Sequence, residues 1–189
     1  FRSTRVVAVG EPTSEMRRRY TQVLRGHIAL AQMRFPAGTN GGQLDVMARA
    51  PLWADGVDYA HGTGHGVGSY LSVHEGPQRI AKASSEEPLQ PGMICSNEPG
   101  YYKAGAFGIR IENLVMVRRW DNPAAEGEYL EFENLTWAPL ERELIDSALL
   151  SDGERAWVND YHAKVLAKIG PQLDSETADW LASRCAPLT

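Results

Sequence analysis

The feature of this sequence that most restricts its fold is a run of alternating glycines around two histidines. Residues 61–68 read His-Gly-Thr-Gly-His-Gly-Val-Gly, so glycine occupies positions 62, 64, 66 and 68. Glycine weakens helices and strands because it loses more conformational freedom on folding and offers no side chain to pack. This pattern is typical of a segment that is shaped for a site.

The spacing of His61 and His65 narrows the kind of site. In the helical zinc-protease motif a glutamate follows the first of two histidines on a regular helix, whereas glycine follows His61 here. If the segment is extended, both imidazoles lie on the same side, because side chains alternate along a strand. We therefore interpret the segment as an extended carrier of two metal-capable imidazoles.

Two glutamates complete this set of metal-capable side chains. Glu98 lies in Asn-Glu-Pro-Gly and Glu112 in Gly-Ile-Arg-Ile-Glu-Asn. The alternation of residues 109–117 predicts a strand with Arg110 and Glu112 on one face. Imidazole nitrogen and carboxylate oxygen suit ions such as Mn²⁺ and Co²⁺, and a pair of such ions acidifies water and polarises a carbonyl group. The set points to metal-dependent hydrolysis.

Structural explanations of the same residues stay open at this point. Glu112 could simply form an ion pair with Arg110 on the same strand face. Glu98 could be a turn residue before a proline, and His74, which a glutamate follows in a loop, could cap that turn. His65 has the weakest structural explanation, because glycines on both sides leave little packing around it.

Composition limits the class of protein and its partners. The chain has 189 residues, of which 43% are hydrophobic and 23% charged, as expected for one soluble domain with a small appendage. The formal net charge of −5 gives no basic surface, so we expect no nucleic-acid partner. The sequence lacks an apolar run of the ~18 residues that span a bilayer, so we expect no membrane partner. Cys95 and Cys185 lack the spacing of a disulfide framework, which favours the reducing cytoplasm.

Local patterns predict a mixture of helices and strands. Apolar residues at helical spacing, capping residues and alternating runs indicate the element boundaries. We expect strands over residues 5–9, 93–98, 109–117 and 129–136, and helices over about 14–35, 44–54 and 151–169, with a short helix around Trp180. The sequence alone therefore predicts an α+β chain.

Six segments carry further motifs in a specific order. They are Gly-His-Ile-Ala at 26–29, Leu-Trp-x-x-Gly-x-Asp-Tyr at 52–59, His-Gly-Thr-Gly-His-Gly-Val-Gly-Ser-Tyr-Leu at 61–71, Val-His-Glu-Gly-Pro at 73–77, Asn-Glu-Pro-Gly-Tyr-Tyr at 97–102 and Gly-Ile-Arg-Ile-Glu-Asn at 108–113. Together they resemble the aminopeptidase P branch, the Xaa-Pro aminopeptidases, of the pita-bread metallopeptidases. The resemblance implies the α+β pita-bread (creatinase/aminopeptidase) fold, a curved and mostly antiparallel sheet with helices on its outer face.

The resemblance also implies a division of the chain and an activity. Residues 1–140 would form most of the catalytic domain without its N-terminal part, and residues 141–189 a helical C-terminal extension. The expected reaction releases the N-terminal residue from peptides with proline at the second position. Two divalent ions would serve as cofactors, Mn²⁺ in the first place and Zn²⁺ or Co²⁺ as alternatives. Expected partners are Xaa-Pro peptides, the upstream part of the same polypeptide and, if the tryptophan-containing tail is exposed, a second copy in a homodimer.

Roles for single residues follow from the resemblance, motif by motif. His65, Glu98 and Glu112 are implied metal ligands. Glu98 would also act as the general acid/base, and Glu112 would bridge both ions. His61 and His74 are the implied catalytic histidines, which contact the substrate.

Two arginines accompany this set. Arg110 is implied to orient a ligand carboxylate without binding metal. The family has two further aspartate ligands upstream, the second of them two residues before a Thr-Arg pair. Thr4-Arg5 matches that pair, but the aligned position is Arg2, which would repel a cation. We therefore expect a fragment that lacks two of five ligands and binds metal poorly by itself.

The alternative function is a catalytically inactive pita-bread module that only binds. The absence of the two aspartates favours this alternative for the chain by itself. The presence of both histidines of the glycine-rich segment, His74 and the two glutamates favours the enzyme, because a purely binding relative has no need of them.

Overall fold

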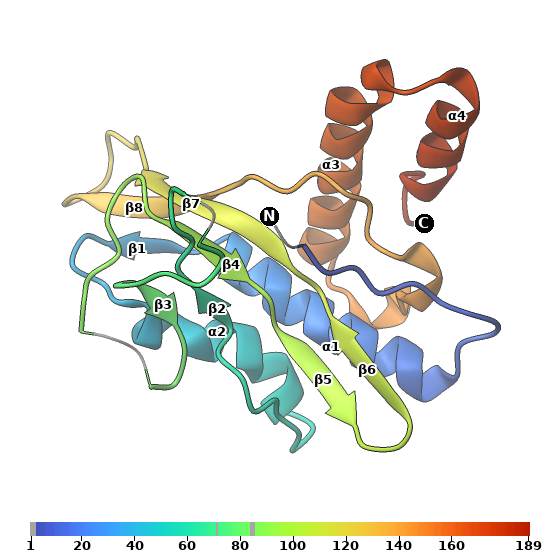
Figure 1. Cartoon of the computed structure of the whole chain (residues 1–189), viewed down its shortest axis with the longest axis horizontal. Coiled ribbons are helices and arrows are strands. Elements are labelled where there is room, and N and C mark those ends of the chain that lie inside the picture. Colours follow the sequence, from blue (N-terminus) through green and yellow to red (C-terminus); the bar gives the residue numbers. More distant parts are fainter. Residues whose placement is uncertain (1–2, 71, 84–85) are drawn as a thin grey trace.

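The structure is a computed structural model that describes residues 3–70, 72–83 and 86–189. Arg2, which we predicted to repel a cation, lies outside the described residues. Helices and antiparallel strands build the chain (Figure 1), so the predicted α+β class is confirmed. Among the described residues, the helices are too short or too polar for any of them to cross a bilayer.

A four-stranded antiparallel sheet forms the framework. In spatial order its strands are β1 (Arg34–Pro36), β8 (Tyr129–Asn134), β7 (Asn113–Arg119) and β4 (Ile94–Asn97). Two antiparallel pairs extend it, namely β2 (Gly64–His65) with β3 (Arg79–Ile80) and β5 (Gly100–Lys103) with β6 (Phe107–Arg110). The β5–β6 hairpin prolongs the line of β4 and β7 (Figure 1).

Two helices cover one face of this framework. They are α1 (Ser14–Ala31) and α2 (Gly41–Trp53), which lie side by side behind the strands in Figure 1. The Thr13 hydroxyl accepts a hydrogen bond from the Met16 N–H and so caps α1. Asn40 and Gln43 form a capping box at the start of α2. Each cap satisfies backbone donors that the first turn of a helix leaves free.

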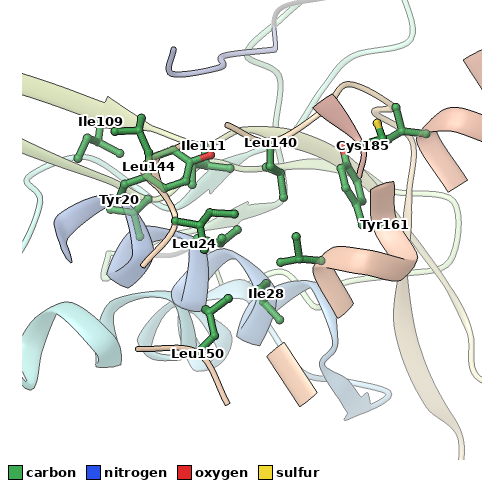
Figure 2. Packing of buried hydrophobic residues seen from close by; sticks show 14 of the residues in the cluster. Tyr20, Leu24, Ile28, Ile109, Ile111, Leu140, Leu144, Leu150, Tyr161 and Cys185 are labelled. Atoms are coloured by element: carbon green, nitrogen blue, oxygen red, sulfur yellow. The ribbon is translucent and has the colours of Figure 1, made fainter. Parts of the chain in front are cut away.

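The helical C-terminal region shares the core of the rest of the chain. It comprises η1 (Arg142–Leu144), η2 (Ser147–Leu149), α3 (Asp152–Ile169), η3 (Gly170–Gln172) and α4 (Ser175–Arg184). The predicted capping box of Ser151 and Glu154 opens α3. Tyr161 and Cys185 join a cluster with Tyr20, Leu24 and other residues of α1 (Figure 2). This region is therefore packed on the sheet-and-helix body through apolar contacts.

Three predicted elements are wrong, and tertiary contacts explain two of them. The first helix ends at Ala31 instead of continuing to residue 35, because Phe35 pairs with β8 and packs on Phe132. The strand predicted over residues 109–117 is interrupted, since the N–H groups of residues 111 and 112 bond to carbonyls outside the β7 ladder. Residues 5–9 form no strand, and Val9 is 95% exposed.

The α1–α2 contact gives a stability test. A Cβ atom at Gly26 would lie 2.0 Å from the Ala48 carbonyl oxygen, and a backbone atom inside a helix yields little. We expect Gly26→Ala to lower the free energy of unfolding by about 1–3 kcal/mol, measured by urea denaturation. Gly153→Ala in α3 is the control, because a Cβ there meets no atom within 4 Å. A Gly26→Ala protein as stable as the control would contradict the close contact.

Candidate metal centre

The pairing of β4 with β7 brings the two glutamates together. The strands are antiparallel, and their last paired residues are Asn97 and Asn113. Glu98 is the residue after β4 and Glu112 the residue before β7, so both lie at the same end of the β4–β7 ladder. Both are buried, at 8% and 4% exposure. Two carboxylates that are distant in sequence thus meet because of strand register.

The glycine-rich segment adds His65 to this end of the ladder. Gly66 bridges to Cys95 of β4, and the His65 N–H donates to the Ser96 hydroxyl at 2.9 Å. A Cβ at Gly64 would lie 2.0 Å from the Ser96 carbonyl oxygen, so only glycine permits this approach. The segment therefore lies directly against β4, in an extended conformation at residues 64 and 65.

The three side chains form a compact set of donors. The ligand atoms of His65, Glu98 and Glu112 all lie within 4.8 Å of one another. Among the described residues this is the one group of three or more such side chains at that spacing. Burial raises the pKa of Glu98, and the negative charge of Glu112 raises it further, although Arg110 and His65 oppose the shift. A cation between the carboxylates would relieve their repulsion.

The orientation of His65 also suits a metal ion. Its Nδ1 lies 2.9 Å from the Gly66 carbonyl oxygen. A carbonyl only accepts hydrogen bonds, so Nδ1 carries the proton and the Nε2 lone pair is free to bind metal. Nε2 lies 3.4 Å from Oε1 of Glu98. A nitrogen and carboxylate oxygens without thiolate match borderline and hard divalent ions, so the residues present fit such ions.

Arg110 pairs with Glu98 through Nη1 and Oε2 at 3.2 Å. Its Nε donates to the Tyr102 hydroxyl at 2.8 Å, and that oxygen lies 2.9 Å from Nε2 of His61. Since His61 Nδ1 donates to the Gly62 carbonyl, Nε2 accepts from Tyr102. Burial lowers the pKa of His61, which agrees with this neutral form. In the described structure Glu112 bonds to Thr4 instead of forming the simple ion pair with Arg110.

The other predicted histidine lies at the open side of the cluster. His74 is exposed, and its ring centroid is 4.1 Å from that of His65. His61 is half-buried and is linked to the cluster through Tyr102 and Arg110. The structure thus brings all six predicted site residues to one place, with His74 nearest to solvent.

Sequence reasoning missed two hydroxyl groups that hold the carboxylates. The Thr4 hydroxyl donates to Oε2 of Glu112 at 2.6 Å. The Ser96 hydroxyl donates to Oε1 of Glu98 at 3.2 Å. The only signal for Thr4 was its place in the Thr-Arg pair, and no local pattern marks Ser96. Such hydrogen bonds fix the direction of a ligand carboxylate.

A buried ionic cluster at α2 supports the start of the glycine-rich segment. Arg49 of α2 is 1% exposed and pairs with Asp45 and Asp58. It also donates to the carbonyl oxygens of Tyr59 and His61, each at 2.8 Å. Burial alone would lower the pKa of Arg49, but its hydrogen bonds to Asp45 and Asp58 raise it. The guanidinium therefore stays charged and ties the segment to α2.

Comparison with known families supports a hydrolytic site. Residues 2–119 match the model of metallopeptidase family M24, and residues 128–188 match that of the C-terminal region of peptidase M24. A probable Xaa-Pro aminopeptidase P of Laccaria bicolor is 48% identical over 98% of this chain and 30% of its own length. Aminopeptidase P2 of Arabidopsis thaliana is 52% identical over 98% of this chain and 27% of its own length.

Solved structures agree with this likeness. The X-prolyl aminopeptidase of Caenorhabditis elegans, described as a cytosolic enzyme with a di-nuclear active site, superposes with a TM-score of 0.94 and 39% identity. It is covered over 31% of its length, against 98% of this chain. An X-Pro aminopeptidase of Thermotoga maritima gives a TM-score of 0.55 and 34% identity, over 69% of this chain and 33% of its own. The chain thus spans about 30% of the curated relatives that it matches.

The Thr4 hydrogen bond gives a test of the centre. Thr4→Val keeps the shape of the side chain but removes the donor to Glu112. We expect the affinity for Mn²⁺ in the full-length protein to fall about 10-fold, measured by isothermal titration calorimetry. Thr39→Val is the control, because among the described residues the Thr39 hydroxyl bonds only to the Pro36 carbonyl, in an exposed turn. Equal affinities in the two variants would show that Thr4 does not orient the ligand.

Proposed function

The chain belongs to metallopeptidase family M24, and from this membership we propose that it carries most of the active site of an Xaa-Pro aminopeptidase. The reaction would release the N-terminal residue from peptides that have proline in second position. The observation that carries the proposal is the convergence of His65, Glu98 and Glu112 within 4.8 Å. The names of the relatives reported above support the substrate class.

We propose two divalent ions as cofactors, with Mn²⁺ the first choice and Zn²⁺ or Co²⁺ as alternatives. His65, Glu98 and Glu112 would hold them, with Glu112 between the two. When bound, the ions would acidify water and polarise the scissile carbonyl. Three donors are few for two ions, so we propose that upstream residues of the full-length polypeptide complete the site. The di-nuclear site of the Caenorhabditis elegans relative supports the number of ions.

The side chains of this chain divide the remaining work. Glu98 would also move a proton as general acid/base, since its carboxylate lies among the donors that would hold the ions. His74 is exposed beside His65 and could donate to the carbonyl oxygen of a peptide. His61 would contact the substrate through its ring. Arg110 would keep the Glu98 carboxylate in place through its ion pair.

Further assignments belong to the whole protein. We propose residues 1–140 as most of the catalytic domain and residues 141–189 as its helical extension, because the strands end before residue 140. We also propose peptides as partners, a cytoplasmic location, as for the relative described as cytosolic, and contact with the upstream polypeptide. We also propose a homodimer, which the exposure of the tryptophan-containing tail supports, since Trp180 of α4 is 52% exposed.

The rival proposal is an inactive binding module. It would need none of the hydrogen bonds that orient the donors, such as Thr4 to Glu112 and Ser96 to Glu98. These bonds favour the enzyme, because an inactive module has no need to hold the carboxylates of Glu98 and Glu112 in fixed directions.

Removal of the proposed general acid/base separates the two functions. We expect Glu98→Gln to abolish release of the first residue from an Xaa-Pro peptide by the full-length protein with Mn²⁺, because glutamine neither moves the proton nor binds as an anion. Free amino acid is measured by chromatography. Glu133→Gln, at an exposed position of β8, is the control and should keep the activity. Activity that survives Glu98→Gln would refute the assignment.

A further inference from the structure

Arg5 joins three parts of the chain that lie far apart in the sequence. Its Nη1 donates to the Glu112 carbonyl oxygen at 2.6 Å, and Nη2 donates to Oδ1 of Asn113 at 2.6 Å. Nη2 also donates to the Tyr161 hydroxyl at 2.9 Å. The same guanidinium bonds to the carbonyl oxygens of residues 138 and 139. The N-terminal segment, the start of β7 and α3 therefore meet at one side chain.

These bonds are directional and hard to replace. Among the ion pairs of the described residues, none involves Arg5, so its charge is met by neutral oxygens. Hydrogen bonds from a charged donor are shorter and stronger than those between neutral groups. Asn113 and Tyr161 are buried, at 1% and 4% exposure, and a buried acceptor without a donor is costly. The planar fork of the guanidinium thus holds its partners in one arrangement.

Tyr161 is the anchor of this arrangement in the C-terminal region. Its ring stacks on Trp157, with ring centroids 5.3 Å apart and an interplanar angle of 9°. It also stacks on Trp137, with centroids 5.9 Å apart and an angle of 22°. Its hydroxyl donates to the Ala138 carbonyl oxygen at 2.8 Å while it accepts from Arg5. The aromatic stack leaves the ring little freedom, so the hydroxyl is held where Arg5 needs it.

Glu112 is held on every side by the segment that Arg5 fixes. Its N–H donates to the Thr4 carbonyl oxygen at 3.2 Å, and its carboxylate accepts from the Thr4 hydroxyl. Its carbonyl oxygen accepts from the Ser3 hydroxyl at 2.8 Å as well as from Arg5. The residue lies between β6 and β7, outside the strand ladders. Its position therefore depends on residues 3–5, and Tyr161 helps to hold these.

We propose that Arg5 and Tyr161 are positioning residues through which the helical C-terminal region sets the metal affinity of Glu112. The inference rests on the proposed metal site, but the proposed function does not require it. Neither residue touches the donor atoms, so both act through the backbone of Glu112. The C-terminal region would then be a part of the metal centre as well as a packing surface.

The test compares two tyrosines whose buried hydroxyl groups each form a hydrogen bond with the chain after residue 135. Tyr161→Phe keeps the aromatic stack but removes the link to Arg5. Tyr20→Phe is the matched control, because its hydroxyl accepts from the Glu141 N–H at 3.0 Å and does not bond to Arg5. A third variant, Arg5→Lys, keeps the charge and loses the fork. Mn²⁺ binding to each full-length, metal-stripped protein is measured by isothermal titration calorimetry, and the unfolding free energy by urea denaturation.

We expect Tyr161→Phe to weaken Mn²⁺ binding at least about threefold and Arg5→Lys about 10-fold, while Tyr20→Phe binds like the wild type. The visible absorption of the Co²⁺-loaded protein, which reports coordination geometry, should change in Tyr161→Phe and Arg5→Lys but not in Tyr20→Phe. Equal affinities in Tyr161→Phe, Tyr20→Phe and wild type would overturn this inference but not the proposed function. Equal weakening by Tyr161→Phe and Tyr20→Phe would do the same. A wild-type protein that binds neither ion would refute the proposed function as well.

Discussion

The antiparallel pairing of β4 with β7 is the constraint on which the candidate metal centre depends. Side chains alternate along a strand, so a slip of one residue would turn one carboxylate to the opposite face of the sheet. Val115 and Val117 of β7 are buried among apolar side chains with Cys95 of β4. This apolar face fixes the register, and the register places Glu98 and Glu112 at the same end of the strand pair. Packing on one side of the sheet thus decides chemistry at its end.

The glycine-rich segment depends on the same strand. β4 presents its second edge to residues 64–67, through the bridge of Gly66 to Cys95 and the bond from the Val67 N–H to the Ile94 carbonyl. Ser96 connects both sides of the site, because its hydroxyl accepts from His65 and donates to Glu98. Arg49 holds the preceding residues from α2. The four residues of β4 therefore position the candidate metal donors of three segments, namely His65, Glu98 and Glu112.

The sequence was sufficient to predict candidate residues that lie together in the fold, but not the groups that orient them. His65, Glu98 and Glu112 stand in local contexts, alternating glycines and proline turns, that packing alone explains poorly, and the structure brings them together. Thr4 and Ser96 have no such context, since their hydrogen bonds join residues that are adjacent only in the fold. The alternation of residues 109–117 wrongly predicted one continuous strand, because the bonds that interrupt it also join residues that are distant in the sequence. The break at Glu112 arises from bonds to residues 4 and 99, which no local pattern contains.

The break in that strand also changes which residues hold Glu112 in place. A glutamate inside a regular ladder is held by its strand neighbours, so its direction is set by the sheet. Glu112 instead takes its backbone partners from residues 3–5, and Arg5 fixes those residues against Tyr161. Burial and the negative charge of Glu112 raise the pKa of Glu98, because the two carboxylates repel each other when both are ionised. The bonds that hold Glu112 beside Glu98 therefore come from residues 3–5 and, through Arg5, from Tyr161 of α3.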